Sequence, residues 1–193
     1  MQARASGNVA RRRTLPEYLE WPDVGALLRF APHPQAALVM LVQARAGLRV
    51  KEALGLERAD LFLETERPTL KVGWLTAKGS KERIVPVHPE LAAALRTAVA
   101  YGAGKGGPLV AANPSTAWRW VQEAYRRAVA AGALPPGRRI GTHTLRHSAA
   151  RHWLESGVPL NRVSVWLGHA SLQTTLIYLE ILPDALGDMA RVP

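Results

Sequence analysis

The sequence predicts an α+β fold that is mainly helical and carries a small three-stranded antiparallel sheet. Two observations support this prediction. Apolar residues recur at helical spacing over most of the chain, and Gly or Pro stands at many of the expected helix ends. Three runs rich in Leu, Val, Ile and Trp lie between residues 60 and 87, and a turn at 77–80 joins the last two into a hairpin. One domain with a central hairpin accounts for both observations.

The first part of the chain is expected to hold three helices and then the three strands. The helices cover 22–30, 35–46 and 50–54, and the strands cover 60–63, 69–75 and 82–87. The helix 35–46 is almost wholly apolar, so it should be buried on nearly all sides. Helices 89–101 and 114–131 follow. In the latter, Trp118 begins the expected inner stripe, although Trp118 and Trp120 cannot both face the core.

The stretch 141–181 is predicted to form three short helices in succession. Thr142 is expected to cap the first helix and Gly157 to stop it. The second helix covers 161–167 and ends at Gly168, and Ser171 is expected to cap the third. The turns are short, so the three helices should lie close together.

Polar side chains are the unusual feature of this stretch. His143, Arg146 and His147 stand at i, i+3 and i+4, so they project from one helix face. His169 lies in the turn before the third helix, and Tyr178 follows nine residues later. An arginine, several imidazoles and a phenol that converge in this way suit phosphate chemistry.

The run HTLRHSA at 143–149, followed by LGH at 167–169 and by Tyr178, resembles the C-terminal signature of the tyrosine recombinases, the phage integrase family that includes the Xer-type enzymes. The resemblance implies that His143, Arg146, His169 and Tyr178 are catalytic. For His147 two interpretations stay open, a supporting role in the site or a buried polar group whose hydrogen bonds are satisfied.

Two upstream segments resemble further motifs of this family. Gly-Leu-Arg at 47–49 is similar to its first arginine motif, which implies that Arg49 is catalytic and that Glu52 orients it. The segment 76–87 is similar to its hairpin, which implies that Lys78 is catalytic. Lys81 and Arg83 are expected to contact DNA phosphates.

The resemblance implies transesterification at a DNA phosphodiester through a 3′-phosphotyrosyl intermediate. Tyr178 would be the nucleophile, Arg49 and Arg146 would bind the non-bridging oxygens, and Lys78 would protonate the leaving 5′ oxygen. The roles of the histidines are not separated at this point. We expect no metal ion or other cofactor, because cationic side chains supply the charge.

Each of these groups also has a plainer interpretation. Tyr178 could be an ordinary core tyrosine, and Arg49 could simply pair with Glu52 on a helix. His143 and His147, four residues apart, could bind zinc, although no third ligand is defined. At the level of function, the alternatives are a DNA-binding architectural module and a type IB topoisomerase-like nicking activity.

Composition favours a polyanionic partner. Lys and Arg number 25 against 15 Asp and Glu, which gives a formal net charge of +10. Double-stranded DNA is therefore the expected partner, and Arg138 and Arg139 before the signature helix are further candidates for contacting it. The chain has no Cys, which excludes disulfides and thiolate metal sites. The sequence shows neither a secretory signal nor an apolar run of about 20 residues. We therefore expect no membrane role and a cytoplasmic location.

The expected organisation is a basic arm at 1–14, a tyrosine recombinase catalytic domain at 15–182 and a tail at 183–193. Family members of ordinary length carry a further N-terminal domain that closes a clamp around DNA. Two expectations remain open at this point: an excised catalytic domain, from which an accessory or clamp domain is missing, or a naturally minimal recombinase. The resemblance also implies that copies of the chain can assemble on DNA, with a tetramer as the candidate form. The tail residues Leu186 and Met189 are candidates for contacts between copies.

Overall fold

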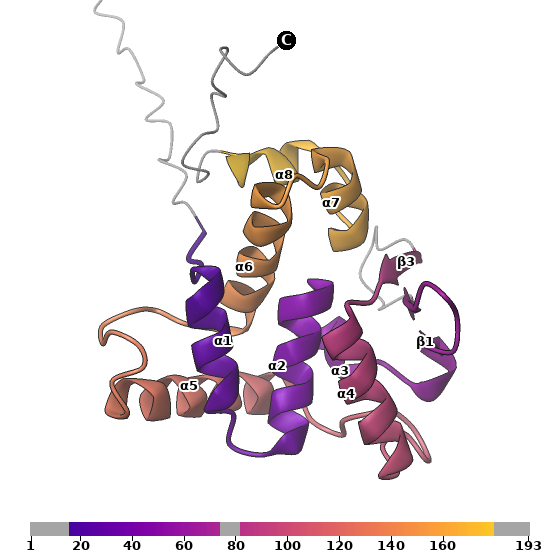
Figure 1. Ribbon diagram of the computed structural model, residues 1–193, viewed down its shortest axis with the longest axis horizontal. Coiled ribbons are helices and arrows are strands. Elements are labelled where there is room, and N and C mark those ends of the chain that lie inside the picture. Colours follow the sequence, from indigo (N-terminus) through magenta and orange to yellow (C-terminus); the bar gives the residue numbers. More distant parts are fainter. Residues whose placement is uncertain (1–15, 74–81, 180–193) are drawn as a thin grey trace, which may run out of the picture.

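The computed structural model describes residues 16–73 and 82–179, and it confirms a mainly helical fold with a small sheet (Figure 1). Within these ranges the elements follow the predicted order. The helices are α1 (Trp21–Arg29), α2 (Pro34–Ala46), α3 (Val50–Leu54), α4 (Pro89–Ala100), α5 (Pro114–Ala130), α6 (Thr142–Glu155), α7 (Leu160–Leu167) and α8 (Gln173–Leu176). A 3₁₀ turn, η1 (Arg58–Asp60), precedes the strands β1 (Leu61–Phe62), β2 (Thr69–Val72) and β3 (Arg83–Pro86).

Helix α2 is the central element of the fold. It packs against α1, α3, α4, α5 and α6, which explains why its sequence is apolar on nearly every side (Figure 1). The helix ends at Gly47, whose backbone is left-handed with φ of 64°. A Cβ at this position would lie 2.7 Å from the ring of Trp153, so the close packing on α6 also requires glycine. The sharp turn places Arg49 at the start of α3.

The sheet is antiparallel in the order β1-β2-β3. Leu70 and Val72 of β2 and Val85 of β3 point into the core, whereas Ile84 is exposed. Because side chains alternate along a strand, Arg83 shares the inward face of β3 with Val85. β2 ends at Val72 in the described range, and residues 74 and 75 of the expected strand lie outside it.

The buried face of α5 differs from the expected stripe. Small residues, namely Ala117, Ala124 and Ala128, form that face together with Val121. Small side chains allow the neighbouring helices to approach closely, and Trp118 therefore lies at the side, 51% exposed, next to Gly141.

The three C-terminal helices are present, with one correction to the predicted caps. Helix α6 begins at Thr142, but its N-cap is the extended residue Gly141, whose N–H donates to Thr144 Oγ1 at 2.9 Å. Thr142 is therefore inside the helix rather than its cap. Ser171 acts as predicted at the start of the third helix, because its hydroxyl accepts a hydrogen bond from the N–H of Gln173 at 3.2 Å. Helix α8 is only four residues long, so Tyr178 lies just beyond it. Gly168 ends α7 in a left-handed conformation, as predicted.

Across residues 16–73 and 82–179, none of the helices combines the length and the apolar character needed to cross a membrane.

Candidate active site

The predicted polar residues of the described chain meet where four segments come together. The start of α3 brings Arg49 and Glu52, and the first half of α6 brings His143, Arg146 and His147. The turn after α7 brings His169, and the segment after α8 brings Tyr178. Neighbouring ring centroids from His143 through His147 and Tyr178 to His169 lie 6.2, 5.7 and 6.3 Å apart.

Arg146 lies at the base of this cluster, with only 4% of its side chain exposed. Its Nη1 donates to the carbonyl of Gly47 at 2.6 Å, and its Nη2 donates to the carbonyl of Leu167 at 2.7 Å. These carbonyls belong to the C-terminal ends of α2 and α7, where carbonyl groups lack helical partners. Burial and the charge of Arg49 lower the pKa of Arg146 to about 10, so the guanidinium remains protonated at neutral pH.

Glu52 is the common partner of three arginines. Arg83 binds its two carboxylate oxygens with two N–H groups, at 3.0 and 2.8 Å. Arg49 donates its backbone N–H to Oε2 at 2.7 Å and its Nη1 to Oε1 at 3.1 Å, as the sequence predicted. Arg146 Nη1 lies 3.8 Å from Oε2. Burial alone would raise the pKa of Glu52, but the hydrogen bonds and charges of these arginines outweigh it and lower the pKa below its ordinary value.

Replacing Glu52 with Gln is expected to lower the free energy of unfolding by about 3 kcal/mol, because Arg83 and Arg146 would be left buried without a counter-charge. The carboxylate of Glu52 has a lowered pKa in the folded state. Its contribution is therefore present above the ordinary pKa of 4.5 and is lost as pH falls through the lowered folded value. Urea unfolding at several pH values measures both effects.

The matched control is Glu64→Gln, since Glu64 also pairs with an arginine, Arg96, but is 84% exposed. This variant should change stability little. An equal loss of stability in the two variants would contradict the assigned importance of the buried network.

The phenol of Tyr178 is enclosed in the cluster and is 1% exposed. Its hydroxyl lies 2.8 Å from Nδ1 of His147. Burial, followed by the charges of His143 and Arg146, lowers the pKa of His147 to about 4, so its ring is neutral at pH 7 and Nδ1 can accept the phenolic proton. Burial raises the pKa of Tyr178, although Arg146 and Arg49 act in the opposite direction. The tyrosine is therefore neutral in this arrangement.

The other two histidines differ in accessibility. His169 is half-buried, and its Nδ1 lies 2.7 Å from Oγ1 of the buried Thr175. Burial, then the charges of Arg146 and Arg49, lowers the pKa of His169 to about 4. His143 is exposed at the start of α6, and its pKa is also lowered, by partial desolvation and by the same two arginines. The three histidines are therefore neutral at pH 7, and the positive charge of the site comes from the arginines.

We expect the free energy of unfolding to fall as pH is lowered from about 6.5 to about 4, before Glu52 titrates. His147 and His169 have folded pKa values below their ordinary value of 6.5, so only the unfolded chain binds protons in this window. His147→Gln should make the decline less steep, because the side chain no longer titrates. Urea unfolding of both proteins measures the slopes, and equal slopes would contradict the prediction.

The residues predicted to contact DNA have different environments. Lys78 and Lys81 lie outside the described residues. The prediction for Arg83 is wrong: the alternation of β3 turns it inward, where it pairs with Glu52 and its Nε donates to the carbonyl of Trp166 at 2.8 Å. Arg138 is engaged within the chain by Asp23, Glu17 and the carbonyl of Tyr18. Arg139 is exposed.

Sequence reasoning did not find Thr175 or the two helix-end carbonyls that hold Arg146. A threonine in a polar helical turn carries no specific signal, and a carbonyl is independent of residue type. Arg83 could have been found, because Arg83, Val85 and Val87 follow the period of two that marks one strand face.

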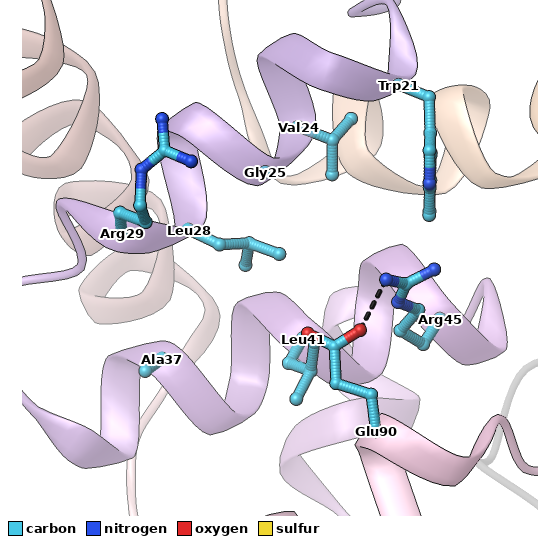
Figure 2. A pocket seen from close by; sticks show the side chains of 9 residues that line it. All are labelled: Trp21, Val24, Gly25, Leu28, Arg29, Ala37, Leu41, Arg45 and Glu90. Atoms are coloured by element: carbon cyan, nitrogen blue, oxygen red, sulfur yellow. Dashed lines mark ion pairs between the residues drawn. The ribbon is translucent and has the colours of Figure 1, made fainter. Parts of the chain in front are cut away.

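A pocket lies outside this cluster. It is found between α1, α2 and α4 and is lined by residues that include Trp21, Leu28, Arg45 and Glu90, of which the last two form an ion pair (Figure 2). None of its lining residues belongs to the predicted site. Among the described residues, no three His, Cys, Asp or Glu side chains are grouped so that they could hold a metal ion.

A mainly helical fold that gathers arginines, histidines and a tyrosine at one junction defines a catalytic domain of the tyrosine recombinase type. The fold supports this class directly. The crystal structure of XerA recombinase superposes with a TM-score of 0.74 at 25% identity, covering 90% of this chain and 63% of that chain. The catalytic domain of bacteriophage HP1 integrase has the same fold, with a TM-score of 0.64 at 24% identity, covering 88% of this chain and 90% of that one.

Residues 18–184 match the phage integrase family, and the chain belongs to that family. It is 34% identical over 204 residues to tyrosine recombinase XerD of Corynebacterium glutamicum, an alignment that covers 94% of this chain and 62% of the relative. The chain thus spans about three fifths of that relative's length.

Proposed function

We propose that the chain carries out site-specific DNA recombination by cleaving and rejoining strands through a 3′-phosphotyrosyl intermediate. The observation that carries this proposal is the junction itself: Arg49 and Arg146 share the carboxylate of Glu52, and the hydroxyl of Tyr178 lies against a neutral histidine beside them. A fold needs no such group of buried cations and rings for stability, because buried charges are costly. Membership of the phage integrase family supports the same function.

In the proposed reaction, the Tyr178 oxygen attacks the phosphorus of a DNA phosphodiester. The bond from phosphorus to the 5′ oxygen breaks, and a bond from phosphorus to the tyrosyl oxygen replaces it. His147 is placed to accept the phenolic proton, and Lys78 is proposed to donate a proton to the leaving oxygen. The ester's energy is retained, so a 5′ hydroxyl of another strand can reverse the step.

Arg49 and Arg146 are proposed to neutralise the non-bridging oxygens of the phosphate. Arg49 has 40% of its side chain exposed and so can meet an arriving phosphate, whereas Arg146 is fixed in the base of the site. Fixed guanidinium groups stabilise charge without reorganising during the reaction. His143 is exposed next to them and is proposed to donate to the phosphate, and the ring of His169 stacks near that of Tyr178. No metal ion or cofactor is invoked.

Double-stranded DNA is the proposed partner, consistent with the net charge of +10. Arg139 is exposed just before α6 and remains a candidate for DNA contact. We also propose that residues 15–182 form the catalytic unit, that a clamp domain completes it, and that copies assemble on DNA. A cytoplasmic location is part of the same proposal, because the enzyme must reach DNA.

The decisive experiment captures the covalent intermediate in the presence of EDTA. The protein is incubated with genomic fragments and denatured, and DNA that remains attached identifies the site. A nicked suicide duplex of that site is then cleaved, and mass spectrometry of the digested adduct locates the modified residue. We expect a phosphotyrosyl peptide containing Tyr178 and a free 5′ hydroxyl. Failure of the folded protein to form any adduct on DNA that it binds, even when a clamp domain is supplied, would reject the proposal.

The burial of Tyr178 favours a second candidate, a DNA-binding module that does not cleave on its own. A phenol that is 1% exposed must move before it can meet a phosphate. Binding without an adduct, followed by an adduct when a clamp domain is supplied, would show that cleavage needs that domain. Relaxation of supercoiled DNA without strand exchange would instead indicate topoisomerase-like activity.

A further inference from the structure

Arg83 was expected on the DNA surface, but it lies inside the cluster, with only 6% of its side chain exposed. All three nitrogen atoms of its guanidinium donate hydrogen bonds. Nη1 and Nη2 bind the two oxygens of Glu52, and Nε binds the carbonyl of Trp166 in the last turn of α7. A DNA phosphate could not replace these partners without dismantling the junction. The role of Arg83 must therefore be exerted through Glu52 and α7.

The carboxylate of Glu52 is shared between Arg83 and the two proposed phosphate-binding arginines. Its Oε1 accepts from Arg83 Nη1 and from Arg49 Nη1, and its Oε2 accepts from Arg83 Nη2 and from the backbone of Arg49. Arg146 Nη1 approaches the same Oε2. A planar two-bond contact fixes both the position and the plane of a carboxylate. By fixing the Glu52 carboxylate, Arg83 also fixes the side chains of Arg49 and Arg146 that contact this carboxylate.

The same side chain also holds the turn that carries His169. Gly168 lies directly on the guanidinium of Arg83, and a Cβ at Gly168 would come within 2.8 Å of Arg83 Cζ. Arg83 therefore joins β3 to the residue before His169. Among the described residues, two segments of the site, the start of α3 and the turn after α7, thus meet at this one guanidinium.

We propose that Arg83 is a positioning residue for strand cleavage, which orients Arg49 and Arg146 through the carboxylate of Glu52 and ties the His169 turn to β3. This inference rests on the proposed function. It assigns no contact between Arg83 and DNA. It requires the two-bond geometry of a guanidinium, which the single ammonium of a lysine cannot reproduce.

The test compares Arg83→Lys and Arg83→Met with the control Arg58→Met. Arg58 is also partly buried and bonded to carbonyls, those of Val99 and Ala103, but none of its partners belongs to the site. Single-turnover cleavage is measured on a nicked suicide duplex with either a normal phosphodiester or a methylphosphonate at the cleavage position. The methylphosphonate carries no negative charge, so it depends much less on correctly placed arginines. All variants are assayed where circular dichroism shows them folded.

On the phosphodiester, both Arg83 variants are expected to cleave about 10²-fold more slowly than the wild type, with unchanged DNA binding. On the methylphosphonate, the difference from the wild type should largely disappear. A purely structural defect would slow both substrates equally, and that result would overturn the proposal. Wild-type cleavage by Arg83→Lys, or an equal defect in Arg58→Met, would also overturn it.

A second measurement does not depend on cleavage. In NMR spectra of protein with ¹⁵N-labelled arginine, Arg83→Met should shift or broaden the side-chain signals of Arg49 and Arg146, whereas Arg58→Met should leave them in place. Unchanged Arg49 and Arg146 signals in Arg83→Met would overturn the positioning role. Should the wild type cleave neither substrate, the proposed function fails by itself, and the NMR result still decides the role of Arg83.

Discussion

Replacing Tyr178 with Phe is expected to abolish the covalent protein–DNA adduct completely while leaving DNA affinity unchanged. The substitution removes the single oxygen that is proposed to attack the phosphate, and the ring that packs in the cluster is retained. His147 loses a hydrogen-bonding partner, so the free energy of unfolding should fall by about 1 kcal/mol. Denaturing gels on the suicide duplex measure the adduct, and urea unfolding measures the stability.

Tyr125→Phe is the matched control for this prediction. Tyr125 also has a hydrogen-bonded hydroxyl, which donates to the carbonyl of Pro135 and accepts from the N–H of Arg138, far from the cluster. Its loss should lower stability by a similar amount and leave adduct formation intact. An adduct that survives in Tyr178→Phe would mean that another residue is the nucleophile.

Arg146→Lys is expected to slow cleavage by about 10³-fold, although the charge is conserved. Lysine cannot reach the carbonyls of both Gly47 and Leu167 and still present a donor toward the phosphate, because its donors sit on one nitrogen. DNA binding should change much less than cleavage, since one phosphate contact is a small part of the interface. Single-turnover rates and equilibrium binding on the same duplex separate the two effects.

The control on the same helix is Arg151→Lys. Arg151 is also buried, but it pairs with Glu20 and Glu155 and lies over the ring of Tyr18, none of which belongs to the cluster. We expect unchanged cleavage at temperatures where this variant is folded. A similar loss of cleavage in both variants would indicate that a stable α6, rather than the placement of Arg146, limits the reaction.

Much of the fold was predictable because local patterns and tertiary packing agree. The apolar run 35–46 became the buried α2, and Gly47 and Gly168 ended their helices in the left-handed conformation that favours glycine. The shared helix face of His143, Arg146 and His147 was also predictable from spacing alone. These features depend on neighbours in sequence, which is why the sequence reveals them.

The errors concern partners that are distant in sequence. The period of two along residues 83–87 marks the inward face of the strand, but Arg83 and Glu52 are 31 residues apart, and nothing local identifies Glu52 as the partner that Arg83 meets there. The same holds for Trp118, which was expected to face the core and is half exposed because the alanines of α5 pack there instead. The burial of the Tyr178 hydroxyl against His147 likewise depends on how α8 docks on α6.

The position of Arg146 determines at what stage of folding the proposed DNA cleavage becomes possible. Its guanidinium is held by the ends of two helices, one of which lies 99 residues earlier in the chain. Neither half of the polypeptide can therefore assemble the phosphate-binding group alone. A C-terminal fragment or a partly unfolded molecule would carry Tyr178 without the assembled arginine. Under the proposed function, DNA cleavage therefore requires that the chain has folded completely.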